Sequence, residues 1–108
     1  MPNRRIRIRI WGKVWHVVYI PQRGMKLGGK LKSGICDPHQ RIIWVTARGN
    51  RRHTLAHEIC HAHLFSSYAD EEGVDRIAFN LLHGLYTPFI RLNLEMMKVF
   101  ERASRVLR

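Results

Sequence analysis

The sequence is short of acidic residues in its first half, holds only two cysteines and has no long apolar run. No stretch approaches the roughly 20 apolar residues that a membrane-spanning helix needs, so we expect no membrane partner. Met1 to Arg5 lead into alternating Ile and Arg, unlike the unbroken apolar segment of a signal peptide, and we expect a cytoplasmic protein. Cys36 and Cys60 form no CxxC pair and are expected to be free thiols.

The scarcity of acids leaves a strong positive charge. Through His57 the chain holds 13 Lys or Arg and one acid, Asp37, and the net charge of the whole chain is +11. Such a basic half attracts nucleic acid or acidic partners, but it is also typical of a solvated face that keeps a small protein soluble. Both interpretations stay open, because no stacking aromatic motif or DNA-binding helix pair is visible.

The 108 residues, 45% of them hydrophobic, suit one globular domain spanning residues 1–108. Alternating apolar residues predict a sheet of about four strands within residues 4–46, whereas residues 21–33 read as a loop. The expected strands are 5–10, 14–20, 34–36 and 41–46. We expect an antiparallel sheet whose first two strands form a hairpin.

From Arg52 onward the apolar residues follow a helical period. Capping residues divide this half into three expected helices. Their ranges are about 52–65, 70–85 and 88–107. With the sheet first and the helices after it, the predicted fold class is α+β.

The first of these helices carries the motif His57-Glu58-Ile59-Cys60-His61. Two histidines four residues apart point the same way on a helix and can bind one zinc ion. Glu58 lies about 100° further round the helix, where it can act as the general base on a water molecule. Cys60 lies away from the histidine face and is expected to pack in the core. The alternative is a helix with surface histidines.

A catalytic zinc ion needs a third protein ligand and an open position. The next predicted helix offers Glu71 and Glu72, and Asp75 follows one turn after Glu71. Asp75 could hydrogen-bond a ligating histidine and fix its tautomer, so the spacing favours Glu71, with Glu72 as the alternative ligand. These acids could instead only complement the dipole of their helix.

Three segments together resemble the ImmA/IrrE type of metallopeptidase, a gluzincin-type family with an HExxH helix and a glutamate helix. They are the motif extended to Ala62, the run Glu71-Glu72-Gly73-Val74-Asp75-Arg76-Ile77-Ala78, and Leu81-Leu82. The resemblance implies a zincin-like minimal domain, with zinc bound by His57, His61 and Glu71 and with Glu58 as catalytic base. It also implies a bacterial or phage setting, where relatives cleave or antagonise transcriptional repressors.

Only nine residues separate His61 from Glu71, fewer than that family's pattern suggests, so a reduced, phage-borne form with a tight interhelical turn is expected. A SprT-like arrangement would use His83 as the third ligand instead. The candidates for stabilising the oxyanion are Tyr68, His83 and Tyr86, and the sequence does not choose among them. His53 is expected to be exposed or a substrate contact, and His63 to be structural.

The resulting hypothesis is a zinc metalloendopeptidase whose protein or peptide substrate lies extended beside a sheet edge, the strand at 41–46. The alternative is a non-catalytic, zinc-stabilised binding module. It would use the basic sheet face around Arg5, Arg7 and Arg9 on nucleic acid or on a transcriptional regulator.

Overall fold

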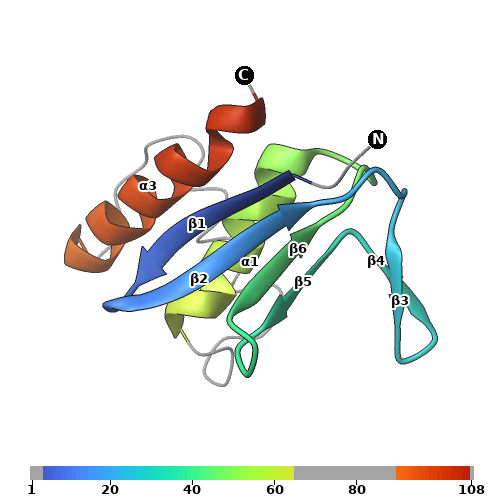
Figure 1. Cartoon of the computed structure of the whole chain (residues 1–108), viewed down its shortest axis with the longest axis horizontal. Helices are drawn as coiled ribbons and strands as arrows, with labels where there is room; N and C mark the ends of the chain where they lie inside the picture. Colours follow the sequence, from blue (N-terminus) through green and yellow to red (C-terminus); the bar gives the residue numbers. More distant parts are fainter. Residues whose placement is uncertain (1–3, 65–89, 108) are drawn as a thin grey trace.

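The computed structural model describes residues 4–64 and 90–107, and it has an α+β fold in which the sheet precedes the helices (Figure 1). The predicted fold class is therefore confirmed for these residues. The elements are β1 (Arg4–Ile10), β2 (Lys13–Tyr19), β3 (Met25–Leu27), β4 (Lys30–Lys32), β5 (Gly34–Asp37), β6 (Ile42–Val45), α1 (Arg51–Leu64), α3 (Ile90–Ser104) and a 3₁₀ turn at Arg105–Leu107.

Four strands form one sheet in the order β1-β2-β6-β5. β1 pairs antiparallel with β2, and β5 pairs antiparallel with β6, but β2 and β6 run parallel. The prediction of an antiparallel sheet is thus wrong for its central pair. The chain first forms β5 at the edge of the sheet and then turns directly back into β6. β6 therefore lies between β5 and β2 and runs in the same direction as β2.

The segment predicted as a loop, residues 21–33, contains a second small sheet in which β3 pairs antiparallel with β4. Its turn is made by Gly28 and Gly29, whose φ angles are 59° and 78°. Two consecutive positive φ angles give a turn whose twist matches that of a hairpin, and glycine adopts them without a steric penalty. The loop prediction is therefore wrong here.

One face of the four-stranded sheet packs against the two described helices (Figure 1). The alternation of β1 places its isoleucines in the core, where Ile8 and Ile10 are buried, and leaves Arg5, Arg7 and Arg9 exposed. The other strand residues in the core are Trp15, Val17, Tyr19, Ile43 and Val45.

α1 confirms the helix predicted at 52–65 as far as Leu64, and it begins one residue earlier than predicted, at Arg51. Asn50 caps its start, since the side-chain oxygen accepts a hydrogen bond from the His53 N–H at 3.1 Å. The apolar positions expected to share one side of this helix are all buried, namely Leu55, Ala56, Ile59 and Ala62. This packing fixes α1 against the sheet and orients the motif that it carries.

α3 lies within the third predicted helix, 88–107, and buries Met96, Val99 and Phe100. The hydroxyl of Tyr19 donates a hydrogen bond of 2.7 Å to the Ala103 carbonyl near the end of α3, which ties this helix to β2. The second predicted helix, 70–85, lies outside the described residues. Two of the three predicted helices are therefore seen in the part of the chain that the structure describes.

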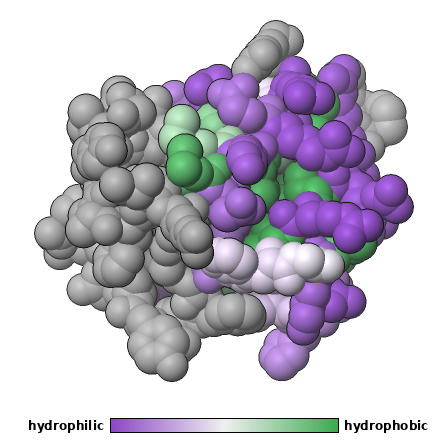
Figure 2. Space-filling model, turned by 90° about the vertical axis from the view of Figure 1, so that its left-hand side faces the viewer, coloured by the Kyte–Doolittle hydropathy of each residue, from purple (hydrophilic) through white to green (hydrophobic). Residues whose placement is uncertain are grey.

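Hydrophilic side chains cover most of the described part of the face in Figure 2, with some apolar groups between them. The exposed large apolar residues include Leu94 and Met97 on α3 and Trp11 in the β1–β2 turn. Neither described helix has the length and apolar composition needed to cross a bilayer.

Candidate metal centre

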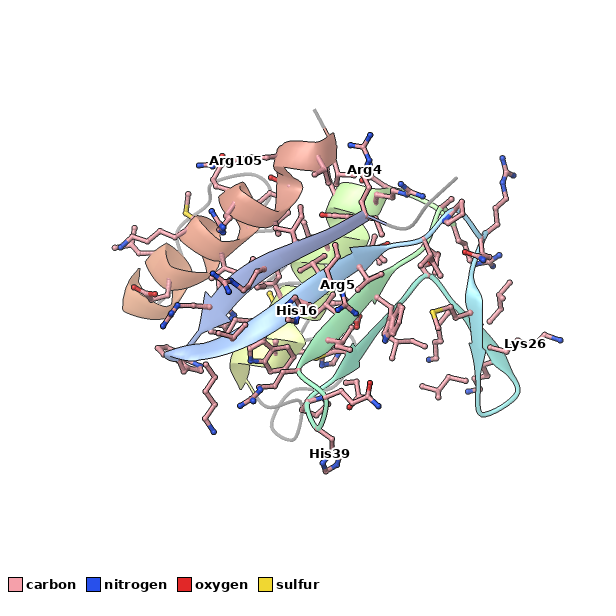
Figure 3. The ribbon with its side chains drawn as sticks, in the orientation of Figure 1. Arg4, Arg5, His16, Lys26, His39 and Arg105 are labelled. Atoms are coloured by element: carbon pink, nitrogen blue, oxygen red, sulfur yellow. The ribbon has the colours of Figure 1, made fainter. Side chains whose placement is uncertain are left out.

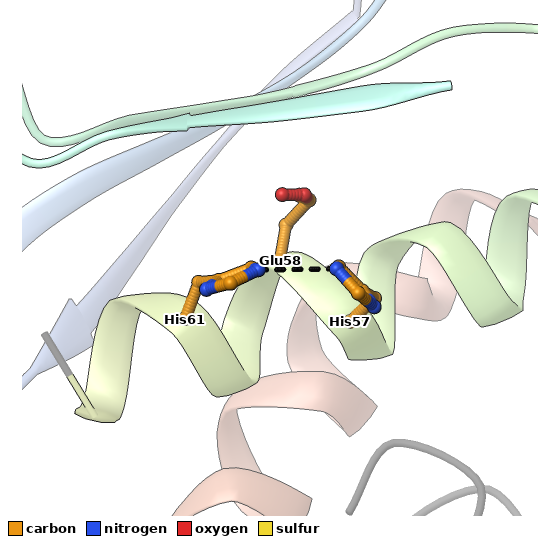
Figure 4. A group of neighbouring side chains, drawn as sticks. All are labelled: His57, Glu58 and His61. Atoms are coloured by element: carbon orange, nitrogen blue, oxygen red, sulfur yellow. Dashed lines mark hydrogen bonds between the residues drawn. The ribbon is translucent and has the colours of Figure 1, made fainter. Parts of the chain in front are cut away.

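The two histidines of the motif lie one turn apart on α1 and face each other (Figure 4). Their Nε2 atoms are 3.1 Å apart, and their rings are inclined at 68° with centroids 4.7 Å apart. His61 is buried and His57 is half-buried. The pair is thus presented by a helix whose opposite side is fixed in the core.

This separation suits a metal ion. A tetrahedral zinc ion with bonds of about 2.0–2.1 Å holds two ligating nitrogens about 3.3 Å apart. The observed 3.1 Å between the Nε2 atoms therefore needs only a small adjustment. Together with the Glu58 carboxylate, the two imidazoles offer ligand atoms that all lie within 4.8 Å of one another. The predicted metal-binding pair is brought together as the motif requires, and the donor set does not by itself identify the metal.

Glu58 points from α1 toward the strands, beside the gap between the two imidazoles (Figure 4). It is 5% exposed, although it carries a carboxylate. Gly34 at the start of β5 makes room for it, because a Cβ atom there would lie 3.1 Å from Glu58 Cγ and 2.5 Å from Thr54 Cγ2. The lack of a side chain at Gly34 allows the strand and the helix to approach closely at the position of Glu58.

A cavity of about 350 Å³ opens over this group between α1 and β5. His53, His57, Glu58 and His61 line it from α1. Its other described walls come from β5, from the turn that follows β5 and from the β3–β4 hairpin, with Leu27, Lys32, Gly34, Ile35, Cys36 and Pro38 among them. The histidines and the carboxylate are therefore open to a ligand, although the helix that carries them is packed in the core.

β5 is an edge of the four-stranded sheet as described, and it borders this cavity. The Ser33 carbonyl accepts a hydrogen bond from the Thr46 N–H. By the alternation of an antiparallel ladder, Gly34 and Cys36 then direct their backbone groups away from β6. The sequence-based choice of residues 41–46 as the edge is wrong, since β6 pairs on both sides.

Both cysteines are thiols in this environment. Cys60 is fully buried in the core, as predicted, and burial together with the nearby Glu58 carboxylate raises its pKa to about 12. Cys36 borders the cavity, and burial followed by the charges of Glu58 and Asp37 raises its pKa to about 12 as well. Neither cysteine belongs to the group of His57, Glu58 and His61 that could hold a metal ion.

The other histidines of α1 differ in role. His63 is buried, and its Nδ1 donates a hydrogen bond of 2.9 Å to the Ile59 carbonyl. Burial lowers the pKa of His63, which keeps the ring neutral, and the predicted structural role is confirmed. His53 was expected to be exposed or a substrate contact; it is half-buried and lines the cavity.

The remaining predicted site residues lie outside the described residues, and their roles stay predictions. They are Glu71, Glu72, Asp75, Tyr68, His83 and Tyr86. Conversely, the cavity walls at Leu27, Lys32 and Gly34 were not predicted from the sequence. The sequence signal that indicates the hairpin is the Gly28-Gly29 pair. It stands between two runs of three residues, one with a central lysine and one with a central leucine.

Comparison of the chain with protein-family models, with curated proteins and with solved structures gives no match.

Proposed function

We propose that this chain is a zinc-dependent metallopeptidase. One observation carries the proposal: two imidazole nitrogens 3.1 Å apart lie beside a buried carboxylate, in a cavity along a sheet edge. A ligand pair, a base and a backbone-binding edge are three of the parts that metal-assisted hydrolysis of a peptide bond uses.

His57 and His61 would hold the zinc ion through Nε2. When bound, the ion supplies a Lewis acid that polarises the scissile carbonyl and makes a water molecule more acidic. Glu58 would accept a proton from the attacking water at its carboxylate oxygen and deliver it to the leaving amine nitrogen. Its buried position against β5 keeps the carboxylate directed toward the reacting atoms.

The substrate would bind as an extended segment along β5. The outward backbone groups of Gly34 and Cys36 can pair with the main chain of a peptide, which gives affinity with little dependence on its sequence. Leu27 from the hairpin is 55% exposed and lines the same cavity, so it offers an apolar contact to a substrate side chain.

The third ligand in this proposal is Glu71, with Glu72 as the alternative and Asp75 supporting a ligating histidine. This assignment depends on the sequence spacing and on the resemblance to ImmA/IrrE-type peptidases. The same resemblance supports a protein substrate such as a transcriptional repressor, in the cytoplasm of a bacterium or a phage-infected cell.

Replacing Glu58 by Gln tests the mechanism, because it removes the base and keeps the size of the side chain. We expect the Glu58→Gln variant to bind zinc like the wild type and to cleave an unfolded protein such as casein about 10²–10⁴-fold more slowly. Glu95→Gln, an exposed change on α3, is the matched control and should leave cleavage unchanged. Cleavage by Glu58→Gln at the wild-type rate would contradict the mechanism.

The alternative function is a zinc-stabilised binding module without turnover, which the exposed arginines of β1 favour. Wild-type protein that holds one zinc ion per chain and cleaves no member of a broad peptide library would support this alternative.

A further inference from the structure

The face of the four-stranded sheet that points away from α1 and α3 has a composition of its own. The residues that alternate with the core residues lie on it, in rows set by the strand register. One row runs through Arg5, Val18, Trp44 and Ile35, and the next through Arg7, His16, Ile42 and Asp37. Arg9 and Val14 form a shorter third row. We call these residues the open sheet face.

One side of the open sheet face is strongly cationic. Arg5, Arg7 and Arg9 are exposed along β1, and no ion pair within the described part of the chain involves them. The strand residue with a carboxylate on this face is Asp37, at the far edge on β5. Its Oδ1 accepts hydrogen bonds from the N–H groups of His39 and Gln40 and is thus occupied by the turn.

Two aromatic side chains occupy the middle of the open sheet face. Because His16 is in register with Ile42 and Val18 with Trp44, the rings of His16 and Trp44 lie on neighbouring strands, one step apart along the diagonal. Both are half-buried, while Val18 beside them is 3% exposed. Figure 3 shows His16 and Arg5 in front of the sheet ribbon, close to each other in this view.

We propose that the open sheet face binds single-stranded nucleic acid. Aromatic rings on a sheet can stack on unpaired bases, and arginines along one strand can contact successive phosphates. A base paired in a duplex hides its ring faces, and among the described residues no helix lies on the open sheet face to enter a groove. Charge complementarity therefore favours nucleic acid as the ligand, and the central rings favour a single strand over a duplex. The arginines of β1, His16 and Trp44 do not line the cavity beside α1, so binding on this face does not require the candidate metal centre.

Fluorescence anisotropy of a labelled 20-nucleotide single strand of thymidine, measured over a series of salt concentrations, tests the site. We expect the affinity to fall with salt. The slope of log K against log salt should become shallower by about 0.7 in Arg5→Ala and in Arg7→Ala, since each variant neutralises one phosphate fewer. Trp44→Leu should weaken binding about 5- to 100-fold and leave this slope unchanged, since it removes stacking and no charge.

Two controls separate the open sheet face from general charge attraction. Lys26→Ala also removes one positive charge, but from an exposed position on β3. The changes in affinity and in salt slope that it causes should be only a small fraction of those in Arg7→Ala. Trp44→Phe retains a ring and should bind within a few-fold of the wild type, which also guards against a folding defect in Trp44→Leu.

Several results would overturn the proposal. Equal losses of affinity in Lys26→Ala and Arg7→Ala would show general charge attraction, and wild-type binding by a folded Trp44→Leu variant would show that no base stacks on the ring. Tighter binding of a 20-base-pair duplex than of the single strand, or no binding at low salt, would also contradict the proposal. Preference for anionic phosphatidylserine vesicles over the single strand would likewise replace it with a membrane-surface role.

Discussion

At the scale of single residues, the candidate site depends on one glycine as much as on the motif. His57, Glu58 and His61 supply the chemical groups, and Gly34 supplies the space in which the carboxylate meets the edge strand. A Cβ atom at Gly34 would lie 2.5 Å from Thr54 Cγ2, far inside van der Waals contact. The glycine therefore sets the distance between β5 and α1.

We expect Gly34→Ala to lower the free energy of unfolding by about 1–3 kcal/mol, because the added methyl group overpacks a close contact. Thr54→Ser removes the Cγ2 methyl group that the methyl group added at Gly34 would contact. The double variant should therefore recover part of the lost free energy of unfolding. Denaturant titration of the four members of this cycle measures the coupling. Additive effects of the two changes would contradict the contact.

The cysteines give a second prediction at this scale. A thiol with a pKa of about 12 is ionised in about one molecule in ten thousand at pH 8, so alkylation of native protein should be slow. We expect iodoacetamide to modify Cys36 and Cys60 at least about 100-fold more slowly in the folded chain than in guanidinium. If zinc protects either thiol from alkylation and a chelator removes this protection, a cysteine binds the metal instead.

At the scale of elements, the sequence predicts α1 well and the pairing of strands less well. The apolar period and the motif agree on the helix, and the alternation of Ile and Arg identifies β1 together with its buried face. The parallel pairing of β2 and β6 could not be predicted, because a strand's side-chain pattern reports its faces and not its neighbours. The β3–β4 hairpin was missed because Leu27 and Leu31 remain exposed, so no buried face marks these strands.

The packing of α3 on the sheet gives the prediction at this scale. The Tyr19 hydroxyl is buried against the Ala103 carbonyl, and that carbonyl lies in the last turn of α3, where helical partners are absent. Burial raises the pKa of Tyr19, which keeps the hydroxyl protonated as a donor. We expect Tyr19→Phe to lower the free energy of unfolding by about 1–3 kcal/mol. Thermal unfolding measures this, and an unchanged melting temperature would show that the bond contributes nothing.

At the scale of the whole molecule, the sheet separates two surfaces. The candidate metal centre and the cavity lie between α1 and the β5 edge, and the open sheet face, with its arginines and rings, lies on the other side. The sequence indicated the metal pair and the charge separately. It could not place Trp44 and His16 beside the arginines of β1, since that arrangement follows from the strand order.

Metal binding should stabilise the whole fold, because the ligand pair is formed by a helix that the unfolded chain lacks. Zinc at about 100 times its Kd should raise the free energy of unfolding by about 2.7 kcal/mol. His61→Ala should remove this increase, whereas His39→Ala, a change in an exposed turn, should retain it. Equal stabilisation of both variants by zinc would point to binding elsewhere.

The zinc content of the purified chain tests the central claim most directly. Elemental analysis should find one zinc ion per chain in the wild type and in Glu58→Gln, and almost none in His57→Ala or Glu71→Ala. Loss of zinc in His57→Ala with retention in Glu71→Ala would confirm the pair and reassign the third ligand. Zinc retained at one ion per chain in His57→Ala, or absent from the wild type after growth with added zinc, would contradict a metal centre on α1.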